Sequence, residues 1–380
     1  MNTLVVTRER DLARYRRQWH DLAAAASQPN PFYEPWMLLP AMRHLLAEGE
    51  SLNVVLLFEG DEDQRLLGLF PLSHDRSYRR LPLRHFSCWE HLHCFATTPL
   101  VRRGHEQACV SGFMAWLDDS RPAMWLVRFP LFAADGPLYR AFEECVRCDG
   151  RILDPIGVKQ RALLDAACPS DQYLRTFVSR KHLKEFRRLW KRLAERGELR
   201  FETFRHGTDD LQAWTDAFLH LEQQGWKGNE STAMACSAAE TAYFNDMMVQ
   251  AESQGRLLMA RLTLDGKPVA MHCGFRSGAG GVAFKIAFDE TWRRFSPGVL
   301  LQLRHTEYLL DHTDIRWVDS CAAPDHPMIE RLWKQKMVVR DFGVSSRRPL
   351  ARALARSIAA LGSLYRSARG GRRNATLFDH

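Results

Sequence analysis

The sequence predicts an α/β protein, of the α+β kind, with two domains built on mixed, largely antiparallel sheets flanked by helices, and a basic helical tail. Its 380 residues exceed what one hydrophobic core usually organises. Segments with helical hydrophobic spacing alternate with strand-like segments, and a strand–turn–strand pattern recurs about 200 residues after its first appearance. We therefore expect domains at residues 1–165 and 166–345, followed by a tail at 346–380.

The first domain is expected to begin with two helices and a hairpin. Residues 11–26 and 36–47 show helical spacing of apolar and charged residues, and the proline-rich segment 29–35 separates them. Residues 52–59 and 65–73 have the pattern of two strands around a Gly-Asp-Glu-Asp turn. The chain thus predicts helices first and an antiparallel strand pair second.

The second domain repeats this order with a clearer hairpin signal. Residues 257–264 and 268–276 flank Asp265-Gly266, a dipeptide that favours tight hairpin turns. A glycine-rich turn then leads to a third strand at 282–288, and residues 299–310 have helical spacing. Because both domains place helices before a hairpin, we interpret them as structural repeats with little residue identity.

Positive charge is concentrated in two segments. The formal net charge is +8, which favours an anionic partner such as a nucleotide cofactor, a nucleic acid or an anionic membrane. Residues 171–196 carry nine Lys or Arg residues among regularly spaced apolar ones, which predicts a basic amphipathic helix with a solvated or an anion-facing surface. The tail predicts a second basic helix that Gly370-Gly371 ends, with membrane contact, partner contact or a plain surface position as its alternatives.

The cysteines and histidines do not predict a metal centre. Cys145 and Cys148 have Cys-x-x-Cys spacing, but no second ligand pair follows, so buried free thiols are the preferred interpretation. His91 and His93 would share one face of a strand, again without a third ligand. The N-terminus lacks the apolar core of a signal peptide, and no apolar run reaches the roughly 18 residues of a membrane span. We expect a cytoplasmic protein, with peripheral contact at the inner membrane face as a variant.

The segment Ser296-Pro297-Gly298 begins the helix predicted at 299–310. Serine is a good helix N-cap, proline fits the first helical turn, and glycine lets a ligand approach the backbone. A helix start of this kind attracts phosphate through its free N–H groups and its dipole. The segment therefore predicts either a pyrophosphate cradle or a simple helix start.

The order of elements around this segment resembles the FemAB-like, CelD-type acetyltransferases of the GNAT superfamily. The matching pieces are the basic helix with Arg180 and Lys181, Leu221-Glu222, Trp226-Lys227, the Asp265-Gly266 hairpin, Lys285, Phe295-Ser296-Pro297-Gly298, Asp319 and Trp333-Lys334. The N-terminal half resembles a degenerate domain of the same kind, without the Ser-Pro-Gly segment. The resemblance implies a GNAT-type N- or O-acyltransferase with acetyl-CoA or another acyl-CoA as co-substrate and no metal.

The donor is expected at Arg294, Ser296, Pro297, Gly298 and Val299. This chain has Arg293-Arg294-Phe295-Ser296-Pro297-Gly298 where many members of the superfamily carry a longer pyrophosphate loop with two spaced glycines, which leaves the identity of the donor open. Substrate binding is expected at Arg180, Trp226, Lys227 and Lys285, the last because a lysine in an otherwise apolar strand needs a partner or a ligand.

Three residues are candidates for the chemistry itself. An attacking amine must lose a proton, and the carbonyl oxygen must be stabilised as it becomes tetrahedral. Glu222, near the end of an expected helix, is a candidate base, with a solvated glutamate as the alternative. Asp319, at a strand end, is a candidate for a catalytic, capping or ion-pair role. The resemblance implies that Lys334, or the neighbouring Lys336, stabilises the oxyanion.

Three functions are compatible with these sequence features. The first is transfer of an acyl group from CoA to an amine or hydroxyl, for which the CelD-type resemblance implies a saccharide or cell-envelope acceptor. The second keeps the fold but uses aminoacyl-tRNA as donor, as the FemAB-like resemblance and the basic helix suggest. The third is a non-catalytic protein that binds a membrane or nucleic acid through its basic segments.

Overall fold

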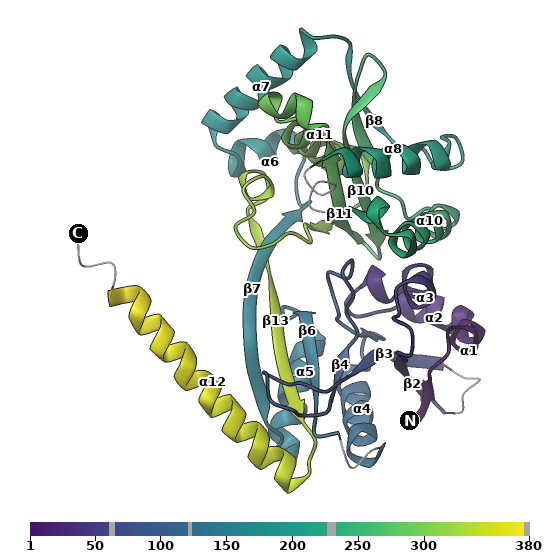
Figure 1. Ribbon diagram of the computed structural model, residues 1–380, viewed down its shortest axis with the longest axis vertical. Coiled ribbons are helices and arrows are strands. Elements are labelled where there is room, and N and C mark those ends of the chain that lie inside the picture. Colours follow the sequence, from purple (N-terminus) through teal and green to yellow (C-terminus); the bar gives the residue numbers. More distant parts are fainter. Residues whose placement is uncertain (61–64, 121–123, 226–232, 376–380) are drawn as a thin grey trace. The chain divides into compact units, whose positions relative to one another are not determined.

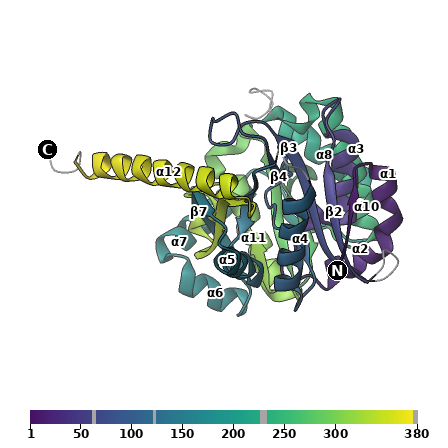
Figure 2. The ribbon, with the colours of Figure 1, turned by 90° about the horizontal axis from the view of Figure 1, so that it is seen from below.

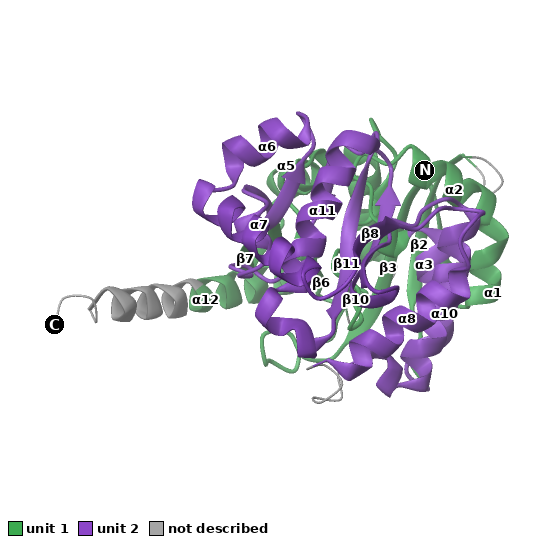
Figure 3. Ribbon diagram, turned by 90° about the horizontal axis from the view of Figure 1, so that it is seen from above, with its two compact units in different colours: residues 1–33, 49–159, 338–380 green, residues 34–48, 160–337 purple. Residues whose placement is uncertain are grey.

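The computed structural model describes residues 1–60, 65–120, 124–225 and 233–375, and Figure 1 shows its helices and strands. The chain divides into two compact units, coloured separately in Figure 3. Unit 1 comprises residues 1–33, 49–159 and 338–380, and unit 2 comprises residues 34–48 and 160–337. Each unit therefore combines segments that are distant in the sequence.

Unit 1 contains a sheet in the order β1-β2-β3-β4-β6-β13. Its strands are β1 (Asn2–Val6), β2 (Asn53–Glu59), β3 (Arg65–Asp75), β4 (His85–Cys88), β6 (Leu126–Ala133) and the second part of β13 (Gln335–Ser345), with the short β5 (Leu100–Val101) beside β3. The pair β2 and β3 is the hairpin expected at 52–73, and Val55 lies opposite Phe70. Neighbouring strands are antiparallel except β4 and β6, which confirms the predicted mixed sheet.

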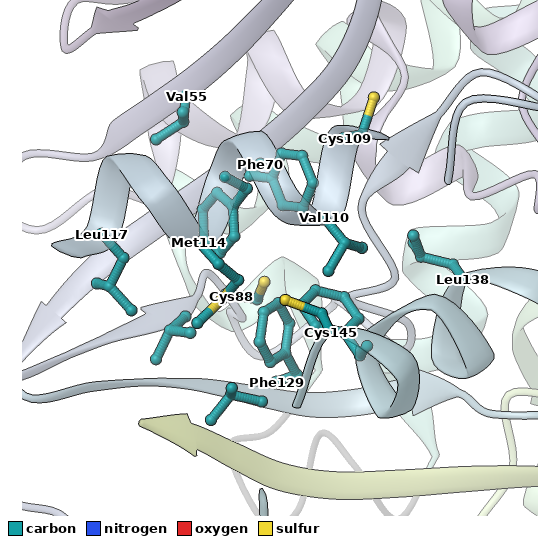
Figure 4. Close-up of a cluster of buried hydrophobic side chains, with 14 of the residues drawn as sticks. Val55, Phe70, Cys88, Cys109, Val110, Met114, Leu117, Phe129, Leu138 and Cys145 are labelled. Atoms are coloured by element: carbon teal, nitrogen blue, oxygen red, sulfur yellow. The ribbon is translucent and has the colours of Figure 1, made fainter. Parts of the chain in front are cut away.

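Helices α4 (Glu106–Ser120) and α5 (Pro137–Asp149) lie side by side and cover this sheet (Figure 2). Their apolar sides form a buried core with the strands, shown in Figure 4, in which the rings of Phe70 and Phe113 stack with centroids 4.3 Å apart. Cys145 lies in this core, as expected of a buried thiol, whereas Cys148 on the next part of α5 is exposed. Remaining elements of the unit are α1 (Glu9–Leu12), η1 (Ala13–Tyr15), α2 (Arg16–Ala24) and η2 (Pro31–Tyr33).

The tail forms helix α12 (Pro349–Ala375), which passes through Gly370 and Gly371. The prediction that these glycines end the helix is wrong: glycine inside a helix costs only about 1 kcal/mol, less than proline. Ile358 packs on Tyr78 and Leu126 of unit 1, while Leu350 and Leu361 are exposed. Among the residues described, no helix combines the length and the apolar character that crossing a membrane requires.

Unit 2 contains a sheet in the order β7-β12-β11-β10-β9-β8. Its strands are the second part of β7 (Leu153–Asp165), β8 (Leu199–Thr203), β9 (Ala260–Leu264), β10 (Lys267–Ser277), β11 (Gly280–Phe288) and β12 (Trp317–Asp319). The three consecutive antiparallel strands expected from the sequence are β9, β10 and β11. Asp265 and Gly266 between the first two both have positive φ, as a tight turn of the Asp-Gly type requires.

The helices of unit 2 correct one prediction. The segment expected as one basic helix is two helices, α6 (Ser170–Phe177) and α7 (Arg180–Ala194), because Val178 is extended and the Ser179 hydroxyl caps α7 by accepting from the His182 N–H at 3.2 Å. The other helices and 3-10 segments are α3 (Pro35–His44), α8 (Leu211–Gln224), η3 (Met234–Cys236), α10 (Ala238–Ser253), η4 (Glu290–Phe295), α11 (Pro297–His312) and η5 (Ile329–Arg331). Helix α3 packs on α10, so an N-terminal segment completes unit 2 (Figure 1).

A pair of buried histidines lies between β10 and α11. The rings of His272 and His305 have centroids 4.5 Å apart, and 3% and 2% of their surfaces are exposed. Burial lowers the pKa of His272 from 6.5 to about 4, and burial together with the neighbouring His272 lowers the pKa of His305. Both rings are therefore neutral at pH 7.

This pair predicts a loss of stability in acid. Between about pH 6.5 and pH 4 the unfolded chain binds more protons than the folded chain. The free energy of unfolding should therefore be largest above pH 6.5 and decrease as the pH drops toward 4, by about 3 kcal/mol for His272. Urea unfolding at pH 7.0 and pH 4.5 measures this change. The variant His272→Met should lose part of the pH dependence, and an unchanged dependence in the variant would contradict the assignment.

Candidate functional site

A cavity of about 420 Å³ lies in unit 2 at the start of α11. Its walls are the last residues of β11, segment η4, the first turn of α11, the end of α8, and the segment around His326 and Met328. Strand β12 pairs in parallel with β11 at Gly280–Val282, and the later residues of β11 have no partner in β12. The end of β11 that lines the cavity is therefore open to a ligand on that side.

The first turn of α11 is formed differently from the prediction. Ser296 has φ 51° and ψ 53°, and its side chain makes no capping hydrogen bond. The expected side-chain cap is wrong because this left-handed backbone conformation replaces the extended one that an N-cap needs. The Ser296 carbonyl oxygen instead accepts from the N–H groups of Val299 and Leu300, at 3.0 and 3.1 Å. Ser296, Pro297, Gly298 and Val299 all line the cavity, and their role in donor binding stays a prediction.

Gly298 holds open the space between this helix start and β11. A Cβ atom at this position would lie 3.4 Å from Phe288 Cδ1 and 3.7 Å from both Ile286 Cδ1 and Met328 Sδ. A methyl group would therefore make ordinary contacts, while a larger side chain would fill the cavity. This space is compatible with the close approach of a ligand proposed from the sequence, and that role stays a prediction.

Arginines give the helix start a positive surrounding. Arg293 lines the cavity, whereas Arg294 is exposed and lies over the Phe295 ring at 4.8 Å from its centroid. Arg192 of α7 also lies over this ring, at 5.7 Å. Phe295 thus holds two guanidinium groups next to Ser296 by cation–π contact. Together with the positive end of the α11 dipole they favour an anionic ligand here.

Glu222 and Lys285 form a buried ion pair beside the cavity. Lys285 Nζ lies 3.2 Å from Glu222 Oε1, and only 9% and 1% of the two side chains are exposed. The backbone N–H of Met234 donates to Glu222 Oε2 at 3.0 Å. Glu222 lines the cavity, and its pairing explains how a lysine is accommodated in the apolar strand β11. The solvated-glutamate alternative for Glu222 is therefore wrong.

His326 also lines the cavity, although the sequence predicted no role for it. Burial lowers the pKa of its imidazole below the ordinary 6.5, and the carboxylate of Glu330 opposes this shift. No motif surrounds it: the local sequence is Pro324-Asp325-His326-Pro327, one of many places where the chain has a histidine. Only the folded chain, which sets His326 and Met328 opposite Gly298 and β11, reveals its position.

Asp319 lies outside the cavity lining, at the end of β12. It is buried and forms an ion pair with Arg161, with Arg161 Nη2 2.5 Å from Asp319 Oδ2. Its other oxygen accepts from the Cys321 N–H at 3.0 Å. Burial raises the pKa of Asp319 above its ordinary value, and the guanidinium of Arg161 opposes this rise. These contacts support the ion-pair interpretation among those left open by the sequence.

Removing this carboxylate should therefore destabilise the fold. We expect Asp319→Ala to lower the free energy of unfolding by about 3–5 kcal/mol, because Arg161 stays buried without it. Denaturant unfolding of Asp319→Ala and of the double variant Asp319→Ala/Arg161→Met measures the effect, and the double variant should recover part of the loss. Unchanged stability in Asp319→Ala would instead favour a role in the chemistry alone.

Lys334, Lys336 and Arg180 are not among the residues that line the cavity. Lys334 is exposed and donates to the Glu330 carbonyl oxygen at 2.5 Å, and Lys336 pairs with the Glu330 carboxylate. Arg180 is exposed in the first turn of α7. Trp226 and Lys227 lie outside the described residues. Their proposed roles stay predictions.

No metal centre is found within the described ranges. There, no group of three or more His, Cys, Asp or Glu side chains is arranged to hold a metal ion. His91 precedes a turn at Leu92 and His93, and neither histidine is in a strand, so the prediction that they share a strand face is wrong. The His93 N–H donates to His91 Nδ1 at 3.3 Å, a contact of a tight turn that a strand would not allow.

Residues 180–327 match the acetyltransferase (GNAT) domain. The matched range contains Glu222, Lys285, the Ser296–Val299 turn and His326, and of the residues that line the cavity Met328 alone lies beyond its end. No curated protein sequence matches the chain. The finer FemAB-like, CelD-type grouping stays a prediction.

Solved structures support the same fold over most of the chain. FemX is 10% identical with a TM-score of 0.59, covering 93% of this chain and 100% of its own. The C-terminal domain (DUF2156) of a putative lysylphosphatidylglycerol synthetase from Agrobacterium fabrum is 14% identical with a TM-score of 0.53, covering 92% of this chain and 96% of its own. At these identities the likeness concerns the fold, and it confirms the mixed α/β class predicted from the sequence.

Proposed function

We propose that unit 2 transfers an acyl group, acetyl in the first instance, from CoA to an amine or hydroxyl acceptor. The observation that carries the proposal is the cavity, in which the first turn of α11 faces the part of β11 that β12 leaves unpaired. This arrangement occurs within the segment that matches the GNAT domain. Within the turn the Ser296 and Val299 N–H groups already donate to the Arg293 and Ser296 carbonyl oxygens, and Pro297 has no N–H, so the Gly298 N–H is the donor proposed for the pyrophosphate. The open strand offers backbone to the chain that links the pyrophosphate to the thioester.

The donor side of the proposal uses the helix start and its arginines. The backbone of Ser296–Val299 would hold the CoA pyrophosphate, while Arg293 and Arg294 would supply positive charge. Gly298 leaves room for the pyrophosphate to approach the helix. A phosphate at such a position gains about 0.3–2 kcal/mol from the helix dipole alone.

The acceptor side uses the Glu222–Lys285 pair. Because Glu222 already accepts from Lys285 and from the Met234 N–H, we propose that it orients the acceptor by accepting from its N–H or O–H group. The predicted substrate role of Lys285 is then to hold this carboxylate ionised and in place. Trp226 and Lys227 are proposed as further acceptor contacts from their sequence position, and Lys334 as the oxyanion donor from the family resemblance.

A second candidate donor is aminoacyl-tRNA, which the exposed face of α7 favours. Arg180, Lys181, Lys184, Arg187, Arg188, Lys191 and Arg192 are all exposed, and within the described residues none of them forms an ion pair. A surface of this kind binds phosphate backbones with a strong dependence on salt. Salt-sensitive tRNA binding together with no response to any acyl-CoA would favour this donor.

The direct test identifies the ligand. Native mass spectrometry of the purified protein should detect retained CoA or acyl-CoA, and a thermal-shift panel of CoA, acetyl-CoA, longer acyl-CoAs and tRNA should show the largest stabilisation with an acyl-CoA. At a ligand concentration 100 times the Kd, binding to the folded state adds about 2.7 kcal/mol to its stability. Stabilisation by tRNA alone would replace the acyl-CoA proposal with the second candidate.

A further inference from the structure

His326 is the one histidine that lines the cavity at the start of α11, as far as the described residues extend. It lies in the segment after β12, and the neighbouring Met328 approaches Gly298 across the cavity. Its Nδ1 atom is buried and has no hydrogen-bond partner in the described part of the chain. The Nδ1 atom therefore makes no hydrogen bond that stabilises the fold, whereas most buried polar atoms do.

The proposed transfer needs a group that accepts a proton at neutral pH. Glu222 is poorly suited, because a lysine and a backbone N–H already bind its oxygens and stabilise its ionised form. Glu290, which also lines the cavity, lies 4.0 Å from the Arg293 guanidinium. The imidazole of His326 lines the same cavity and is neutral at rest, so it can take up a proton there.

The charged groups around His326 suit a base that becomes cationic during the reaction. Glu330 lies one turn further along the chain, and its N–H donates to the His326 carbonyl oxygen at 3.1 Å. The Glu330 carboxylate raises the pKa of His326 and so stabilises its imidazolium form, while burial keeps the resting ring neutral. Glu222, Glu290 and Arg293 are the other charged groups that line the cavity. Lys285, which pairs with Glu222, brings the sum of these charges to zero, so the Glu330 carboxylate is the group that favours the imidazolium.

We propose that His326 is the general base of the acyl transfer, an inference that rests on the proposed function. The unprotonated ring nitrogen takes the proton from the N–H or O–H of the acceptor as the acceptor lone pair forms a bond to the thioester carbonyl carbon. Collapse of the tetrahedral intermediate then breaks the C–S bond. The imidazolium returns its proton to the leaving CoA thiolate, so the ring ends neutral and no electrons are gained or lost overall.

The test compares His326→Gln with His220→Gln, a matched change of an exposed histidine on α8. The probe reaction is hydrolysis of acetyl-CoA, in which water is the acceptor, followed by chromatographic measurement of free CoA. We expect His326→Gln to lower kcat about 100- to 1,000-fold with an unchanged Kd for acetyl-CoA by thermal shift, and His220→Gln to match the wild type. A kcat for His326→Gln within threefold of the wild type would overturn the proposal.

The pH profile separates a base from a structural residue. The wild-type rate should fall below a pKa that lies under 6.5 and be flat above it, and this acid limb should be absent from the residual activity of His326→Gln. Should His326→Gln fold poorly, added imidazole should restore activity to His326→Ala, and a rate independent of imidazole would count against the base. If the wild-type protein binds no acyl-CoA, both the proposed function and this inference are wrong. If it binds acyl-CoA but His326→Gln hydrolyses acetyl-CoA at the wild-type rate, only the inference is wrong.

Discussion

Replacing Gly298 with leucine is expected to abolish acyl-CoA binding while leaving the fold intact. A Cβ atom alone fits at this position, 3.4 Å from Phe288 and 3.7 Å from Ile286 and Met328. The additional carbons of leucine would extend into the cavity that the pyrophosphate and the adjoining chain of CoA are proposed to occupy. We expect the Kd for acetyl-CoA to rise at least 100-fold, so that the thermal stabilisation given by the ligand disappears.

Gly298→Ala is the matched control for this change. Its methyl group makes ordinary van der Waals contacts, and it should retain binding within about tenfold, since one misplaced methyl group is worth roughly 1 kcal/mol. Circular dichroism and the melting temperature without ligand verify that both variants are folded. Full binding by Gly298→Leu would place the donor away from the start of α11.

Replacing Lys285 with methionine is expected to damage both stability and turnover. The change leaves the buried carboxylate of Glu222 without its lysine, which lies 3.2 Å away. Breaking a buried ion pair by removing one partner costs about 3–5 kcal/mol, because a charge stays buried without compensation. Denaturant unfolding should show this loss, and turnover should fall because Glu222 no longer has a fixed position.

A double variant separates the two effects. Lys285→Met/Glu222→Leu replaces the pair with apolar side chains, which is often neutral for stability, so unfolding should return toward the wild type while turnover stays low. As a control, Arg205→Met removes an exposed partner of Asp209 and should cost at most about 1 kcal/mol. Full turnover in the double variant would contradict the acceptor role of the pair.

The sequence predicted those parts of the fold that local signals determine. The Asp265-Gly266 turn and the alternation around it give the β9–β10 hairpin, since both turn residues adopt the positive φ that this dipeptide tolerates. The break between α6 and α7 was missed because the apolar spacing continues across Val178, although Ser179 carried the signal of a helix N-cap. The inclusion of α3 in unit 2 depends on packing against α10, which no local pattern encodes.

In the candidate site, too, the sequence predicted only the features that depend on local signals. The Ser296–Gly298 turn was predictable because proline and glycine constrain the backbone locally, whereas the left-handed conformation of Ser296 was not. Glu222 and Lys285 were singled out separately, but their pairing joins residues 63 positions apart and required the fold. The partner of Asp319, Arg161, is 158 positions away. His326 has no sequence signal because its role depends on what lies across the cavity.

The most direct test of the central claim is calorimetric titration of the wild-type protein with acetyl-CoA. We expect saturable binding of one acetyl-CoA per chain, and we expect it to weaken as salt is raised because the proposed pyrophosphate site is a helix start with arginines. Competition by CoA and loss of binding in Gly298→Leu should accompany it. Absence of binding by acetyl-CoA and by longer acyl-CoAs, to a protein shown to be folded, would contradict the claim that unit 2 is an acyl-CoA-dependent transferase.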